Sequence, residues 1–174
     1  VEDSFTLPYP LRPGYEFAGW VLDGSGMLPA TTLIIYYGTT GDLHYKAEWR
    51  LAEYTITMDL NGGSGETALL YTVIDDEFAL PTPTRNGYEF VGWTGERITT
   101  PQTCVKIPKG STGKKAYTAN WQVIKYTIIT LLEGGNAGSS GAYVYTVEET
   151  FTLPTPTRTG YTFWGWTGEG ITKP

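Results

Sequence analysis

One stretch of about fourteen residues occurs three times in the chain at a fixed spacing. The copies span residues 7–20, 80–93 and 153–166, which gives a period of about 73 residues. Each copy begins with Leu-Pro and ends with Gly-Tyr-x-Phe-x-Gly-Trp. Self-similarity at a fixed period of this kind indicates a tandem array of small modules built from the same elements. The repeat therefore constrains the fold more than any other feature of the sequence.

The period divides the chain into three repeats, which we place at residues 1–52, 53–124 and 125–174. The second repeat carries every segment of the pattern. The first begins inside the pattern, because Val1–Leu7 matches Val147–Leu153, so we expect it to lack its opening hairpin. The third ends before the closing strands, so we expect it to lack its closing hairpin.

Strand signals dominate each repeat. Residues 53–60 alternate between polar and apolar side chains and end at Asn61-Gly62-Gly63, a strong hairpin signal, and residues 67–73 are the expected return strand. Residues 125–130 and 142–147 predict the same opening hairpin in the third repeat.

The segments after the recurring tryptophan predict a second, closing hairpin. Its strands are expected at residues 31–37 and 43–49 in the first repeat, and at residues 103–107 and 116–121 in the second. No window has apolar residues at the helical period, so a short helix near residues 95–103 is the most that we expect. The predicted fold class is mainly β, a small α+β at most, in tandem modules of about 73 residues.

Two glycines in each copy of the stretch have expected backbone roles. Gly14, Gly87 and Gly160 follow the prolines and are predicted to close a turn with positive φ. Gly19, Gly92 and Gly165 lie inside an alternating segment, where a glycine often marks a β-bulge. Such a bulge would turn the next side chain back to the core face.

The next side chain is a tryptophan in every copy. Trp20, Trp93 and Trp166 recur at the same position beside a glycine, so we expect them to be structural core residues rather than sugar-stacking platforms. Trp164 differs, because its counterparts are the small residues Ala18 and Val91, on the predicted outer face. It is the candidate ligand-binding residue, and packing against a neighbouring module is the alternative interpretation.

Composition excludes several classes of function. The net charge of −6 lacks the excess of Lys and Arg that a nucleic-acid partner requires. Cys104 is the single cysteine, so no intrachain disulfide forms, and no apolar run reaches membrane-spanning length. His44, the single histidine, has no Ser or Cys partner motif. We therefore expect no catalytic residues, no bound metal and no cofactor.

The order of these motifs resembles the Listeria–Bacteroides repeat family, the B-repeat type of internalin-like bacterial surface proteins. The resemblance rests on the opening strand and Asn-Gly-Gly turn at residues 54–63, the proline-rich stretch at 80–93 and the aromatic strand Tyr117–Trp121. It implies a small β-grasp-like module, used in tandem in secreted or wall-attached proteins as stalk and adhesion units. It implies no catalysis.

The leading functional hypothesis is a non-catalytic, extracellular spacer at the bacterial cell surface, with adhesion as an added role. The alternative is a module that binds a glycan or a host surface protein through exposed aromatics near Trp164. The expected partners are the neighbouring repeat modules, with no nucleic acid and no membrane contact by this segment. We expect a monomer, and strand-mediated self-association through unpaired strand edges is the alternative.

Overall fold

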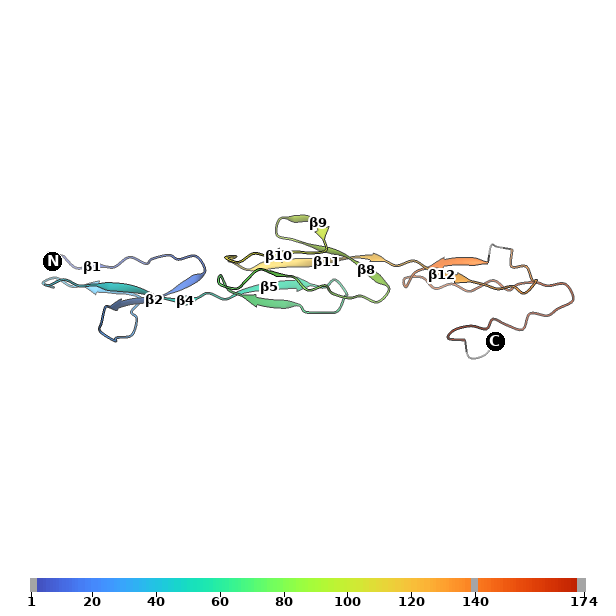
Figure 1. Ribbon diagram of the computed structural model, residues 1–174, viewed down its shortest axis with the longest axis horizontal. Helices are drawn as coiled ribbons and strands as arrows, with labels where there is room; N and C mark the ends of the chain where they lie inside the picture. The colour runs from blue at the N-terminus through green and yellow to red at the C-terminus, as the bar shows by residue number, and fades with distance from the viewer. Residues whose placement is uncertain (1–2, 139–140, 172–174) are drawn as a thin grey trace. The chain divides into compact units, whose positions relative to one another are not determined.

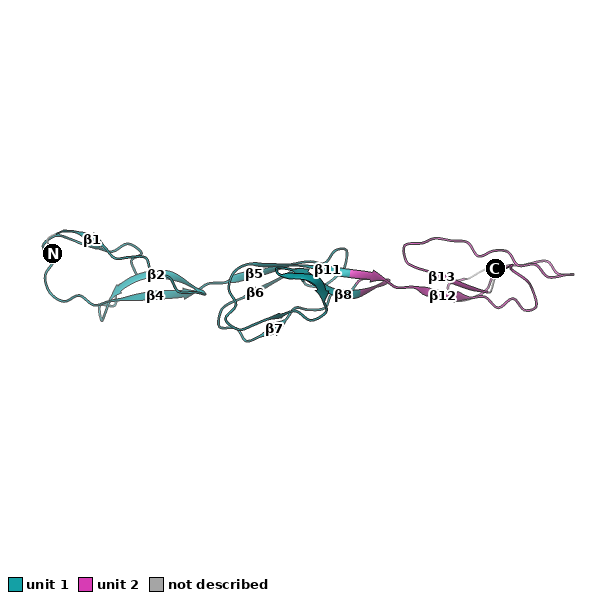
Figure 2. Ribbon diagram, turned by 90° about the horizontal axis from the view of Figure 1, so that it is seen from above, with its two compact units in different colours: residues 1–84, 90–120 teal, residues 85–89, 121–174 magenta. Residues whose placement is uncertain are grey.

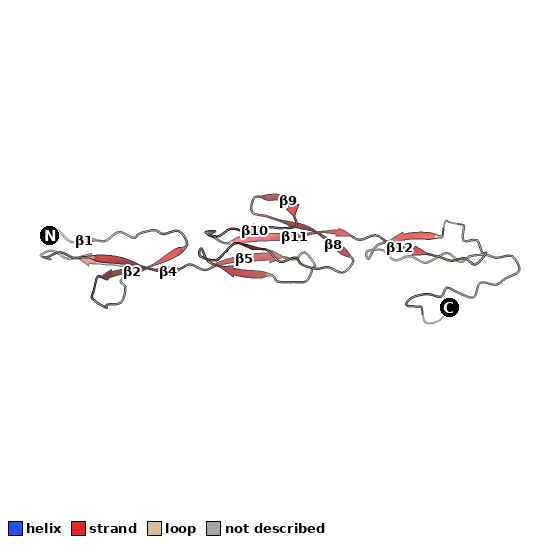
Figure 3. Ribbon diagram, viewed as in Figure 1, coloured by secondary structure: helices blue, strands red, loops and turns tan. Residues whose placement is uncertain are grey.

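The computed structural model describes residues 3–138 and 141–171, and every regular element in them is a β-strand (Figures 1 and 3). The mainly β fold class is therefore confirmed, while the β-grasp-like detail stays a prediction. The short helix near residues 95–103, which was the most that the sequence allowed, is not formed, because Ile98–Gln102 form strand β9. This segment pairs with β8, Tyr88–Gly95, so a sheet partner supplies the backbone hydrogen bonds that a helix would have formed internally.

The chain forms two compact units, which are coloured separately in Figure 2. Unit 1 contains residues 1–84 and 90–120, and unit 2 contains residues 85–89 and 121–174. These units do not follow the 73-residue period, because the turn at residues 85–89 is grouped with the third repeat rather than with its own. The repeat boundaries themselves stay a prediction.

The second repeat contains a five-stranded sheet with the order β6-β5-β11-β8-β9. Strand β5, Tyr54–Asp59, pairs antiparallel with β6, Ala68–Tyr71, as the hairpin signal predicted. On its other side β5 pairs in parallel with β11, Lys115–Val123. The last strand of the repeat is thus inserted between its first strand and the strand that carries Trp93.

The opening hairpin of the third repeat is also confirmed. It consists of β12, Tyr126–Ile129, and β13, Ala142–Tyr145, paired antiparallel.

The predicted closing hairpins were wrong in both repeats. In the first, β4, Tyr45–Leu51, pairs with β2, Tyr15–Leu22, and β3, Ile34–Ile35, pairs with β1, Phe5–Thr6. In the second, β10, Lys106–Ile107, pairs with β7, Phe78–Ala79.

Aromatic packing explains why the distant partner is preferred. Pairing of β2 with β4 places Phe17 directly opposite Trp49, with ring centroids 5.5 Å apart in an edge arrangement. Phe17 is buried as a result. A local hairpin would lose this contact, and aromatic burial dominates the stability of a core this small.

The core of the second repeat follows the strand alternation. Ile56 and Met58 of β5 are buried, as are Tyr117 and Ala119 of β11, and Trp93 is fully buried. The indole Nε1 of Trp93 donates a hydrogen bond to the Pro81 carbonyl oxygen, 3.3 Å away. In the first repeat the Trp20 indole makes the equivalent bond to the Pro8 carbonyl oxygen, at 3.2 Å.

Each recurring tryptophan packs edge-on against the phenylalanine three residues before it. The ring centroids are 5.5 Å apart for Phe17 and Trp20, 5.5 Å for Phe90 and Trp93, and 5.3 Å for Phe163 and Trp166. The two rings therefore share a face, although a regular strand would place residues three apart on opposite faces.

The glycine before the tryptophan coincides with this slip in the first copy. The β2–β4 register shifts between Phe17 and Gly19, which confirms the bulge there. A side chain at Gly92 would lie 2.5 Å from the Gln102 backbone, but the β8–β9 register shifts one step later, between Trp93 and Gly95. Gly165 lies outside any strand of the described residues, so the bulge predicted there was wrong.

The burial of Trp93 yields a stability prediction. Trp93→Ala should lower the free energy of unfolding by about 3–5 kcal/mol, because it removes a large buried ring and leaves a cavity. Trp164→Ala is the control and should change it by less than about 0.5 kcal/mol, since that ring is exposed. Denaturant unfolding followed by circular dichroism measures both variants. Equal losses would contradict the assignment of Trp93 as the core residue.

Candidate functional site

Trp164, the candidate ligand-binding residue, is 86% exposed. Its counterpart Val91 is 36% exposed, and Ala18 is partly exposed. The position therefore faces outward in every copy, and only the third repeat places a large aromatic there. Its role in binding stays a prediction.

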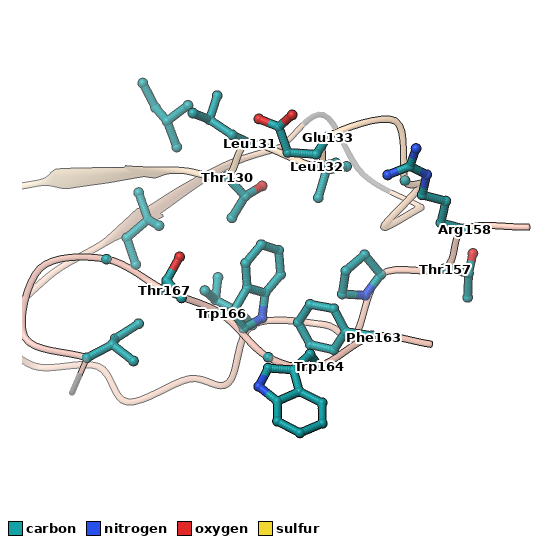
Figure 4. A pocket seen from close by; sticks show the side chains of 18 of the residues that line it. Thr130, Leu131, Leu132, Glu133, Thr157, Arg158, Phe163, Trp164, Trp166 and Thr167 are labelled. Carbon is teal, nitrogen blue, oxygen red and sulfur yellow. The ribbon is translucent and has the colours of Figure 1, made fainter. Parts of the chain in front are cut away.

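Beside this residue, unit 2 contains a cavity of about 970 Å³ (Figure 4). One wall is formed by residues 128–133, and the opposite wall by residues 153–171. Figure 4 shows the indole of Trp166 pointing toward the wall that carries Thr130 and Leu132, whereas the ring of Trp164 points away from that wall. Trp166 therefore belongs to the interior of the cavity and Trp164 to its outer rim.

The second repeat shows what occupies the equivalent space. Ile128 and Trp166 correspond to Ile56 and Trp93, and both of these are 0% exposed. They are covered in the second repeat by β11, whose Tyr117 is paired with Met58. The cavity is thus the place that a closing strand fills in the complete repeat. Core packing explains the apolar part of its lining, such as Ile128 and Trp166.

Polar side chains also line this cavity, among them Thr130, Thr157 and Thr167. Glu133, Arg158 and Glu169 contribute charged side chains, and the Arg158 guanidinium is stacked 4.0 Å from the ring centroid of Tyr161. Within residues 3–138 and 141–171, no three His, Cys, Asp or Glu side chains are grouped closely enough to hold a metal ion.

The predicted structural glycines lie in three turns of the same geometry. Gly14, Gly87 and Gly160 have φ of 80°, 76° and 81°, in the left-handed region as predicted. In each turn an arginine stacks on the tyrosine that follows the glycine, at 3.8–4.0 Å from the ring centroid. Gly14 and Gly87 are buried, whereas Gly160 is exposed.

Sequence reasoning missed the residues that bury the first two of these turns. They are Val73 against Gly14 and Val147 against Gly87. Both valines end a Tyr-Thr-Val segment in the opening hairpin of the following repeat. The recurrence of Tyr-Thr-Val was the one sequence signal for this contact. It does not show, however, which residue the valine packs against.

The second of these contacts has an additional polar interaction. The Tyr88 hydroxyl donates a hydrogen bond to the Glu148 carboxylate, with 2.6 Å between the oxygens. This bond to a negatively charged acceptor raises the pKa of Tyr88. The position of Glu148 is taken by Ile74 in the preceding repeat, so the polar interaction is specific to one junction.

Known proteins resemble this chain over most of its length. The family model of the Listeria-Bacteroides repeat domain matches residues 54–113 and 126–172. A protein of Evansella cellulosilytica named as a Gly-rich membrane protein is 31% identical over 170 residues, which cover 95% of this chain and 19% of the relative. A second protein of the same organism, named as a membrane protein, is 26% identical over 159 residues, covering 90% of this chain and 23% of the relative.

The chain thus spans about a fifth of the length of these relatives. No solved structure matches it. In the described part of the chain, no helix has the length and apolarity needed to cross a membrane.

The assignment of the cavity as a strand position yields a second prediction. Ile56→Ala should cost about 2–5 kcal/mol of unfolding free energy, because β11 and Trp93 enclose that side chain. Ile128→Ala, its matched control in the third repeat, should cost clearly less, since Ile128 is already partly exposed. Hydrogen exchange of the β5 and β12 amides measures the two losses separately. An equal loss would mean that the cavity is closed in solution.

Proposed function

The chain belongs to the Listeria-Bacteroides repeat family, and from this membership we propose that it is a non-catalytic, extracellular segment of a bacterial surface protein. In this proposal the tandem β-modules act as a stalk that spaces other parts of the protein from the cell. The names of the two relatives, both described as membrane proteins, support a location at the cell envelope.

The observation that carries the spacer function is a backbone hydrogen bond found at both junctions between repeats. The Ala52 N–H donates to the Gly14 carbonyl oxygen at 3.0 Å, and the Ile124 N–H donates to the Gly87 carbonyl oxygen at 2.9 Å. Ala52 and Ile124 lie in the short segments that lead into the next repeat. A spacer needs linkers with little conformational freedom. A linker that is hydrogen-bonded to the preceding module has fewer accessible conformations than an unbonded one.

The cavity supports a non-catalytic role rather than an enzymatic one. Catalysis requires a cleft in which polar groups converge on one position. Here the wall residues Ile128, Leu132 and Trp166 correspond to core positions of the second repeat, where Ile56, Leu60 and Trp93 are buried.

Protease treatment of intact cells of the source bacterium tests the location. We expect the protease to remove the repeat segment from the cells, as detected with an antibody raised against this chain, while a cytoplasmic protein in the same sample stays intact. Survival of the segment on intact cells, together with its cleavage after lysis, would place it inside the cell and contradict the proposal.

A second function, glycan binding, is favoured by the exposure of Trp164, which is 86% exposed at the rim of the cavity. Exposed aromatic rings provide flat apolar faces that suit the faces of sugar rings. If this function holds, the chain should bind sugars on a glycan array, and Trp164→Ala should reduce binding by about tenfold or more, a loss typical of a central aromatic contact.

Val91→Ala is the matched control for this measurement, because it changes the same position of the second repeat and should leave binding unchanged. Equal binding by wild type and the Trp164 variant would exclude this residue as the contact. An array without any bound sugar, combined with retention of a host surface protein by the wild type alone, would assign the aromatic face to protein recognition instead.

A further inference from the structure

A valine of the following repeat lies directly against the turn glycine at both junctions of this chain. A Cβ atom built on Gly14 would be 2.4 Å from the Cβ and Cγ1 atoms of Val73. A Cβ atom built on Gly87 would be 2.2 Å from Cγ1 and 2.6 Å from Cγ2 of Val147. Real Cβ atoms do not approach other carbons this closely, so only glycine fits at this position without a steric clash.

The two valines occupy the same structural position. Val73 follows β6 and Val147 follows β13, the second strands of two successive opening hairpins. Residues 85–89, which include Gly87, belong to the same compact unit as Val147 (Figure 2). The turn of one repeat is therefore a packed part of the next.

The third turn has the same geometry without the valine. The Tyr161 N–H donates to the Arg158 carbonyl oxygen at 3.0 Å, and the equivalent bonds of Tyr15 and Tyr88 are both 3.1 Å long. Yet no described atom lies within 4 Å of a Cβ built on Gly160. The turn thus keeps its shape in the absence of a partner, so the surface is preorganised for contact.

We propose that the glycine turn is the docking site of each repeat for the opening hairpin of the repeat that follows, with the hairpin valine seated on the glycine. The exposed turn at Gly160 is then the binding surface for the same valine of a further repeat of this kind. The contact fixes one repeat against the next, so local unfolding of one repeat weakens its neighbour. This inference does not depend on where the protein acts.

The backbone bond beside the glycine adds specificity to the docking. Gly87 contacts the incoming valine, while its carbonyl oxygen accepts the Ile124 N–H that leads into the same repeat. The partner is therefore recognised by two features together: an apolar β-branched side chain and a linker amide at fixed spacing.

The three glycines allow a test in which backbone strain and docking are separated. Alanine is strained by positive φ at all three positions, but it meets a valine only at Gly14 and Gly87. Gly87→Ala should raise the hydrogen-exchange rate of the Ile124 amide by about tenfold or more, since this amide is bonded to the displaced turn. Gly160→Ala, with nearly the same φ, is the matched control and should leave every amide outside residues 158–161 unchanged.

The second part of the test removes the two methyl groups of Val147. Val147→Ala combined with Gly87→Ala should restore part of the lost protection, because the atoms nearest the new methyl group are gone. Such non-additivity is the signature of a direct contact. Equal effects of Gly87→Ala and Gly160→Ala, or strict additivity with Val147→Ala, would overturn the docking assignment.

The assignment of Gly160 is tested in a longer chain in which residues 102–174 follow Pro174 again. Pro101 and Pro174 occupy the same position of the repeat, so the added segment continues the pattern without a break. Gly160→Ala should be silent in the 174-residue chain but should raise exchange of the following linker amide by about tenfold or more in the longer chain. A silent substitution in both chains would show that the third turn is not a docking site.

Discussion

The parallel pairing of β5 with β11 is the interaction on which a complete repeat depends. It brings a strand from the end of the repeat to the centre of its sheet, beside the first strand and under the recurring tryptophan. With this pairing in place, Trp93 is fully buried, whereas Trp166 and Trp20, whose neighbour β4 has no such parallel partner in the described residues, stay half-buried. A module near 70 residues has little apolar surface to bury, so the position of one strand decides whether its core is closed.

The sequence allowed the opening hairpins between neighbouring strands to be predicted, but not the pairing of strands that lie far apart in the chain. The opening hairpins follow from Asn61-Gly62-Gly63 and its counterpart, because a tight turn fixes the register of the strands on either side. The place of β11 has no such signal, since its partner Ile56 lies in a segment almost a full repeat earlier. The apolar segments after the tryptophan are therefore predicted to pair with each other, whereas β3 and β10 pair with segments before the tryptophan, and β4 and β11 lie beside the strand that carries it.

The same division applies to the candidate site. The outward position of Trp164 was predictable from strand parity and from its small counterparts Ala18 and Val91. The contact of Val147 with Gly87 was not, because a buried glycine and a turn glycine have the same appearance in a sequence. Comparison of the two junctions shows that the turn glycine has two roles. It adopts positive φ, and its missing side chain leaves space for the valine of the next repeat.

The turn glycines and the outward position of Trp164 differ in how much side-chain variation they accept. The turn glycine has positive φ in all three copies, and at Gly14 and Gly87 a larger side chain would also collide with the next repeat. The outward position before the second glycine holds alanine, valine or tryptophan, and its exposure leaves room for side chains of different size. A single repeat is therefore able to gain an aromatic contact surface without a change in its own core or in its junction with its neighbours. In the functions proposed above, spacing would depend on the turn glycines and binding on the position of Trp164, so the two roles would use different residues.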